Sequence, residues 1–405
     1  MTNFSIPKTV SGRLVNNRGV HLSAIGHHVA AWLKEPDYWT DLMVSMNLTH
    51  CVCLSDSDGA MVPGPDGRSA IQVLLDAGIN PVIRFLPSNL PRKFTHMDHV
   101  ATAVRQAEPY GVKLIFQWPN EPGNEREWVH DVPDDWWDIF LDHWQGFARI
   151  VIDRGGIAGF PDGPCYDEDP FPRITSTWDD WLDGNCIYLG HFYGLNRPPD
   201  YPYDAIQREG LQWTEDDLKE ALGPWYDNPD YNDVPLELMN RKRREQMDPC
   251  LTAVDDDTCW RGFEKIEYWM LLNFGKVMPM ALTEGGWTPG ARAGGGPNSE
   301  LRYPKPTPDT VATYTTQMFS EDTPMLFQCP WLLADGDMAG GDQGWPYDAW
   351  HGWTFPETGT PDCPRCKPVI RALQTEVTPE QEIAAAQGHI DDAVLLLDKA
   401  LAWLE

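Results

Sequence analysis

The sequence predicts an α/β protein folded as a closed (β/α)8 barrel, a TIM barrel, with a long insertion after the sixth strand and a C-terminal helix. Short, fully apolar runs alternate along the chain with longer amphipathic runs, which is the pattern of a parallel sheet covered by helices. There are eight such apolar runs, the number that closes a barrel. An open, doubly wound sheet is the alternative, but no glycine-rich phosphate loop follows the first apolar run.

The expected elements follow from these runs in chain order. Between the strands, amphipathic runs with the spacing of a helix lie at residues 70–77, 99–108, 134–153, 264–274 and 309–319. The strands themselves are expected at residues 20–26, 48–54, 80–86, 112–118, 173–178, 185–193, 277–283 and 324–331.

Composition limits the classes of function. Of the 405 residues, 42% are hydrophobic, which is enough for a large core. Acidic residues outnumber basic ones by 61 to 31, and the net charge of −30 argues against nucleic-acid binding, which needs Lys and Arg to replace counterions. No stretch reaches the ~20 apolar residues of a membrane span. The first ten residues do not resemble a signal peptide, so we expect a cytoplasmic protein by default, or a secreted one if a leader is missing.

Residues 195–263 interrupt the alternation after the sixth expected strand. They form an acidic, aromatic-rich segment within the expected barrel of residues 1–335. In a barrel, this insertion leaves from the carboxyl end of a strand, the face on which active sites lie. Two interpretations follow: the insertion forms a wall or lid over a cleft, or its aromatic side chains form a small core of their own.

The C-terminal part differs from the barrel. Residues 336–378 are rich in Gly, Pro and Asp and are expected to pack on the barrel as loops. In residues 379–405, Ile383, Ile390, Leu397 and Leu404 recur every seven positions, as in a coiled coil. This helix either joins copies of the chain into a homo-oligomer or docks on its own barrel.

Cysteine spacing leaves several pairings open. Cys250 and Cys259 bracket an acidic loop and could form a disulfide. Cys363 and Cys366 form a single C-x-x-C, which without a second pair is weak grounds for a zinc site. Structural thiols, free or bridged, are the favoured interpretation, and no metal or other cofactor is expected.

Two of the apolar strands deliver a glutamate at their carboxyl ends. The fourth is followed by Trp118-Pro119-Asn120-Glu121-Pro122, and the seventh runs into Thr283-Glu284-Gly285. In a barrel these two carboxylates converge over one face. Paired carboxylates are what glycoside hydrolysis requires, because one protonates the leaving group while the other attacks the sugar or activates water.

These motifs resemble clan A of the retaining glycoside hydrolases, the (β/α)8 group that includes cellulases, mannanases and β-glycosidases. Members carry Asn-Glu at the end of the fourth strand and Glu at the end of the seventh. The resemblance implies that Glu121 is the general acid/base, Glu284 the nucleophile, and Asn120 a ligand of the sugar 2-hydroxyl. It covers roughly residues 20–335 and identifies no family within the clan.

Two further motifs extend the resemblance. Members often place a His and a Tyr at the end of the sixth strand, and Gly190-His191-Phe192-Tyr193-Gly194 matches. His191 and Tyr193 are two residues apart and therefore point to the same side of a strand. The resemblance implies that Tyr193 bonds the nucleophile and His191 orients the acid/base or the substrate. It also implies a sugar platform at the end of the eighth strand, which Trp331 fits.

The pattern departs from the clan at one arginine. Many members place an Arg near the nucleophile at the end of the second strand, whereas the best candidate here, Arg84, falls on the third by our count. Trp118 and Trp287 adjoin the two glutamates, and we expect them to contact substrate.

The sequence thus predicts a retaining glycoside hydrolase that acts on a β-linked oligo- or polysaccharide by double displacement. The alternatives are a catalytically inactive carbohydrate-binding barrel, or an oligomeric recognition or structural protein in which the C-terminal helix assembles the barrels. The sugar, the linkage and the choice between internal and terminal cleavage are left open.

Overall fold

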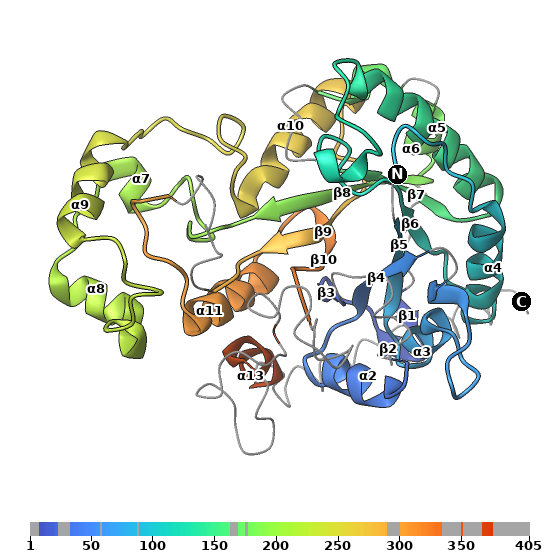
Figure 1. Cartoon of the computed structure of the whole chain (residues 1–405), viewed down its shortest axis with the longest axis horizontal. Coiled ribbons are helices and arrows are strands. Elements are labelled where there is room, and N and C mark those ends of the chain that lie inside the picture. The colour runs from blue at the N-terminus through green and yellow to red at the C-terminus, as the bar shows by residue number, and fades with distance from the viewer. Residues whose placement is uncertain are drawn as a thin grey trace, which may run out of the picture.

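Eight parallel strands form one sheet whose order follows the chain (Figure 1). The computed structural model describes residues 8–22, 33–56, 59–86, 89–162, 169–174, 177–289, 300–333, 350 and 367–375. The strands are β3 (Gly19–His21), β4 (His50–Asp56), β5 (Asn80–Leu86), β6 (Ile115–Gln117), β7 (Ile157–Pro161), β8 (Cys186–Tyr193), β9 (Met280–Gly286) and β10 (Met325–Gln328).

The first and last strands meet and close the sheet into a barrel. Arg18, just before β3, pairs in parallel with Gln328 of β10. The backbone amide of Gln328 donates to the carbonyl of Asn17 at 2.8 Å, and the amide of His21 donates to the carbonyl of Pro330 at 3.0 Å. The predicted (β/α)8 barrel is therefore confirmed.

Helices surround this barrel and bury its outer face (Figure 1). The five predicted helices are present within a residue or two of their expected bounds, and α2, α6 and α13 join them. The helices are α2 (Pro36–Ser45), α3 (Ala70–Asp76), α4 (Met97–Ala107), α5 (Trp136–Asp153), α6 (Trp178–Leu182), α10 (Phe263–Phe274), α11 (Pro308–Ser320) and α13 (Pro368–Thr375). No helix in the described ranges is long and apolar enough to cross a bilayer.

Alternation along the strands divides the apolar side chains into two cores. On β4, Cys51 and Cys53 face the helices, whereas Val52 and Leu54 belong to a separate cluster with Val82. The second cluster fills the inside of the barrel, as in other (β/α)8 proteins. Inward-facing positions at the carboxyl ends of the strands are therefore the ones available for a site.

The fifth strand differs from the prediction. The described residues of the strand expected at 173–178 do not form one: Arg173 ends a 3-10 turn (Phe171–Arg173), and α6 begins at Trp178. The fifth strand is β7, five buried residues that pair with β6 and β8. Its sequence, Ile-Ala-Gly-Phe-Pro, contains two residues that disfavour strands and was overlooked for that reason. Because β7 takes the place of the strand expected at 173–178, the numbering of the later strands is unchanged.

The insertion after β8 packs around aromatic residues of its own. Its helices α7 (Ala205–Glu209), α8 (Glu215–Leu222) and α9 (Leu236–Glu245) are grouped apart from the helices around the barrel (Figure 1). Tyr201 lies in one small buried cluster, and Trp225 and Tyr231 lie in another. These three side chains therefore stabilise the insertion.

Several predictions concern residues outside the described ranges. They are the C-terminal helix at 379–405, nearly all of the loops at 336–378, and the pair Cys363 and Cys366. The possible disulfide between Cys250 and Cys259 is wrong for this structure: both thiols are free, Cys250 is exposed, and Cys259 is buried with its sulfur bonded to the carbonyl of Asp256 at 3.6 Å.

Candidate active site

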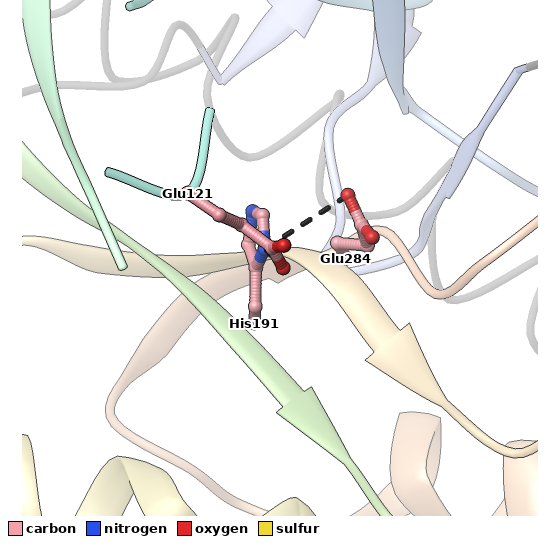
Figure 2. A group of neighbouring side chains, drawn as sticks. All are labelled: Glu121, His191 and Glu284. Atoms are coloured by element: carbon pink, nitrogen blue, oxygen red, sulfur yellow. Dashed lines mark hydrogen bonds and ion pairs between the residues drawn. The ribbon is translucent and has the colours of Figure 1, made fainter. Parts of the chain in front are cut away.

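The two predicted glutamates lie together at the carboxyl ends of β6 and β9 (Figure 2). One carboxylate oxygen of Glu121 lies within 4.8 Å of one of Glu284, and Nδ1 of His191 lies 2.9 Å from Glu121 and 3.9 Å from Glu284. The side chains of Glu121 and Glu284 are 14% and 10% exposed, so both are shielded but reachable.

A register shift between two strands aims Glu284 into the barrel. On β9, Leu282 faces the helices, so an unbroken strand would point Glu284 the same way. Gly190 of β8 pairs with Leu282, but the next residue, His191, pairs with Glu284. One extra residue on β9 therefore reverses the direction of Glu284, as a β-bulge does.

Arg84 and Tyr193 both bond the carboxylate of Glu284. Nη1 of Arg84 donates to Oε2 at 2.6 Å, and the hydroxyl of Tyr193 donates to Oε1. Burial would raise the pKa of Glu284, but nearby His191, Arg84 and His21 and the Tyr193 hydrogen bond outweigh it and lower the pKa to about 2. Glu284 is therefore an ionised carboxylate, the state that a nucleophile needs.

Different groups surround Glu121, on the loop after β6. Oε1 lies 2.9 Å from Nδ1 of His191, and the amide nitrogen of Asn124 donates to Oε2 at 3.1 Å. Neither group carries the fixed positive charge that Arg84 supplies to Glu284. The two carboxylates therefore differ in environment, as acid/base and nucleophile must.

Arg84 occupies the third strand, as counted from the sequence, and still reaches the glutamate of the seventh. It is 2% exposed and lies on β5, facing inward like Val82 two residues before it. Its Nε donates to Oε1 of Gln117 at 3.1 Å, and Nη2 donates to the carbonyl of Thr283 at 3.2 Å. The departure from the clan pattern therefore concerns which strand supplies the arginine, and the contact with Glu284 is made.

The structure brings Asn120 and Trp331 to the same end of the barrel. The side-chain amide of Asn120 donates to Glu127 Oε1 at 3.2 Å. Trp331 follows β10, is partly exposed, and lies with its ring centroid 4.6 Å from that of His21. An accessible indole at this position suits the predicted sugar platform.

Trp118 and Trp287 are packing residues, and their burial does not support the expected contact with substrate. Trp118 is 2% exposed and packs against Phe94 and Phe147. Trp287 is 1% exposed, and its indole N–H donates to the carbonyl of Arg197 at 2.7 Å. Both adjoin a glutamate in sequence, but their rings belong to the core between strands and helices.

Three residues of the site were not singled out from the sequence. Gln117 bonds Arg84, and Asp162 accepts hydrogen bonds from the Tyr188 hydroxyl and the His191 backbone amide. His21, fully buried on β3, faces Trp331. The signal for Gln117 and His21 is an inward-facing polar residue at a strand end, and the signal for Asp162 is a carboxylate directly after β7. For Asp162 and His21, reading this signal required correct strand bounds.

Glu121, His191 and Glu284 also have the spacing of a metal site, since one ligand atom from each lies within 4.8 Å of the others. The Arg84 guanidinium already bonds Glu284 and lies 3.1 Å from His191 Nε2. A fixed positive charge in contact with two of the three ligands opposes a second cation, so the group fits hydrogen bonding better than metal binding.

Comparison with known proteins gives similarity to glycoside hydrolases at the level of the fold. No protein-family model matches the sequence, and no curated protein matches it. A β-xylosidase of Caulobacter crescentus aligns over 89% of this chain and 67% of its own length at 12% identity, with a TM-score of 0.47.

Two other solved structures give the same result. A family 39 glycoside hydrolase of Bacteroides cellulosilyticus aligns over 89% of this chain but only 62% of its own, at 15% identity and a TM-score of 0.43. An endoglucanase of Thermotoga maritima aligns over 88% of this chain and 96% of its own length, at 14% identity and a TM-score of 0.41. All three solved structures are of glycoside hydrolases; at these identities the likeness is one of fold alone, and no family is identified.

Proposed function

We propose that the chain is a retaining glycoside hydrolase that cleaves a β-linked glycan by double displacement. The observation that carries the proposal is the pair of carboxylates, Glu121 and Glu284, whose nearest oxygens lie within 4.8 Å across one end of the barrel. Retaining enzymes keep their carboxyl groups ~5–5.5 Å apart, whereas inverting enzymes leave room for a water at ~6.5–9.5 Å. The short separation supports retention.

The proposed steps follow from the two environments. Glu284, ionised and held by Arg84 and Tyr193, attacks the anomeric carbon while Glu121 protonates the departing glycosidic oxygen. A glycosyl ester of Glu284 results. Glu121, now ionised, removes a proton from water, which attacks the ester and releases a sugar of unchanged anomeric configuration. Asn120 is proposed to bind the 2-hydroxyl of that sugar, and Trp331 to lie under its ring.

The test is hydrolysis of a panel of aryl β-glycosides and β-linked oligosaccharides by wild type, Glu284→Ala and Glu121→Ala. The exposed Glu220 on α8 supplies a matched control, Glu220→Ala, which should behave as wild type. We expect Glu284→Ala to be inactive. Glu121→Ala should keep part of its rate on aryl groups that leave without a proton, and should lose about 10²–10⁴-fold on those that need one.

The stereochemistry of the first product decides the mechanism. NMR of a fresh reaction should show the β-anomer before mutarotation. Release of the α-anomer would establish inversion and contradict the proposed role of Glu284. Sugars that bind to wild type without turnover would instead favour the inactive carbohydrate-binding barrel.

A further inference from the structure

Arg84 contacts Glu284 directly and also contacts His191, the residue that faces Glu121. One guanidinium nitrogen, Nη1, lies 2.6 Å from Glu284 Oε2, and a second, Nη2, lies 3.1 Å from Nε2 of His191. His191 in turn faces Glu121 through its other ring nitrogen, Nδ1, at 2.9 Å. A continuous chain of polar contacts therefore links Glu284, Arg84, His191 and Glu121.

The chemistry of the guanidinium determines which group donates and which accepts in each of these contacts. Arginine is always a donor and never an acceptor. Nε2 of His191 must therefore present its lone pair to Arg84, and the amide nitrogen of Gln117, another donor, also lies 3.5 Å from the same Nε2. A neutral imidazole with an unprotonated Nε2 carries its proton on Nδ1. His191 then donates a hydrogen bond to Glu121.

We propose that Arg84 is a positioning residue for the acid/base as well as for the nucleophile, because it fixes the tautomer of His191 and hence the hydrogen bond that His191 donates to Glu121. This inference rests on the proposed function for its catalytic meaning. The tautomer itself is a property of the free protein.

The tautomer determines where the acid proton of Glu121 can go. An Nδ1–H group can donate to Oε1 but cannot accept a proton from it. Oε1 is therefore occupied as an acceptor, and Oε2 is the oxygen that carries the transferable proton. Asn124 donates to the second lone pair of that oxygen. The imidazole thus holds Glu121 in place without diverting its proton.

An effect on Glu121 can be separated from an effect on Glu284 by the leaving group. Help from the acid matters little for an aryl group that departs as a stable anion, and matters greatly for one that does not. A residue that acts on the nucleophile alone should slow all substrates by the same factor. One that also positions the acid should slow poor leaving groups more. The parameter to compare is kcat/KM, which reports the step that forms the glycosyl ester.

Arg84→Lys and Tyr193→Phe form the matched pair. The lysine ammonium keeps a positive charge for Glu284 but lacks the fork that spans two acceptors. Tyr193→Phe removes a hydrogen bond to Glu284 and leaves the contact between Arg84 and His191 in place. We expect Arg84→Lys to lower kcat/KM by a factor about 10-fold larger for substrates with poor leaving groups than for those with good ones. This difference lies within the range of acid catalysis. Tyr193→Phe should lower kcat/KM by the same factor for both kinds of substrate.

A double-mutant cycle tests whether the effect passes through His191. In His191→Asn, the side-chain NH2 of asparagine takes the place of the Nδ1–H donor, and no atom occupies the place of Nε2, which accepts from Arg84. Adding Arg84→Lys to this variant should change the leaving-group dependence no further. A full additional 10-fold effect would show that Arg84 acts on the acid by another route.

Nitrogen NMR of the ring tests the tautomer without a substrate. We expect His191 in wild type, identified by its loss in His191→Asn, to carry hydrogen on Nδ1 and none on Nε2, and Arg84→Lys to populate the other tautomer. A protonated Nε2 in wild type would overturn the positioning role even if Arg84→Lys failed to fold. Absence of glycoside turnover with the expected tautomer would overturn the proposed hydrolase alone.

Discussion

The hydroxyl of Tyr193, on the sixth strand of the barrel, donates a hydrogen bond to Oε1 of Glu284 on the seventh. Burial, together with the charges of Glu284 and Glu121, raises the pKa of Tyr193 well above its ordinary value, so the hydroxyl keeps its proton and remains a donor. The bond orients the carboxylate oxygen that Arg84 does not hold.

Replacing Tyr193 with phenylalanine tests the value of this bond. A hydrogen bond to a charged group contributes ~1.5–3 kcal/mol, so we expect Tyr193→Phe to lower kcat/KM about 10–100-fold. Kinetics on an aryl glycoside measure this directly. Unchanged kinetics would show that Arg84 alone orients Glu284.

The low pKa of Glu284 predicts a pH dependence of stability. In the folded chain its pKa is about 2, below the ordinary value of 4.5, so its charge stabilises the fold fully above pH 4.5. That contribution, on the order of 3 kcal/mol, is lost as the pH falls from 4.5 through 2. Urea unfolding of wild type and Glu284→Gln should give free energies that converge over this range. A constant difference would contradict the lowered pKa.

Gly285, directly after Glu284, is a position that only glycine fits. Its φ is +140°, and a Cβ there would lie 2.2 Å from the carbonyl oxygen of Phe192 on the neighbouring strand. We expect Gly285→Ala to lower the free energy of unfolding by about 2–4 kcal/mol and to reduce activity, because β8 and β9 must move apart.

The matched control is Gly146→Ala. Gly146 lies within α5, and a Cβ added there meets nothing within 4 Å. Alanine stabilises a helix more than glycine does, so the free energy of unfolding of this variant should rise by about 0.5–1 kcal/mol, with unchanged activity. Thermal or urea unfolding of both variants checks the pair. Equal loss in both would show that the effect at Gly285 is not steric.

Two tryptophans should respond in opposite ways to truncation. Trp331 is accessible at the site, so we expect Trp331→Ala to raise KM about 10-fold or more, through the loss of apolar surface under the sugar, with a small change in stability. Trp287 is buried, and Trp287→Ala should cost about 3–5 kcal/mol of folding free energy. KM and unfolding measurements on both separate binding from packing. A raised KM with unchanged stability in Trp287→Ala would restore that residue to the substrate site.

The barrel and its strand order could be predicted from the sequence because the spacing of hydrophobic residues and the polarity of a segment are local signals. His191 and Tyr193 share a face of β8, as their spacing indicates, and Arg84 and both glutamates reach one end of the barrel. The bulge in β9 was not visible, because a one-residue register shift depends on the neighbouring strand. The burial of Trp118 and Trp287 was not visible for a related reason: closeness to a glutamate in sequence does not determine which way a side chain points.

β7 shows where local signals fail. Its five residues include Gly159 and Pro161, so pattern alone favoured a later segment, and Asp162 at its end was missed. The close approach of strand and neighbour explains the glycine: a Cβ at Gly159 would lie 2.2 Å from a methyl group of Leu189. Such a constraint is set by packing and becomes visible only in three dimensions.

The site is divided between the two halves of the chain. Arg84 and Glu121 precede the turn that follows α5, and His191 and Glu284 come after it; Arg84 and Glu284 are 200 residues apart. A chain severed in that turn, at residues 154–156, would yield two fragments, one with Glu121 and the other with Glu284. Neither fragment could cleave a glycoside by double displacement on its own. Hydrolysis by a mixture of the two would therefore serve as a complementation signal, reporting the docking of one half-barrel on the other.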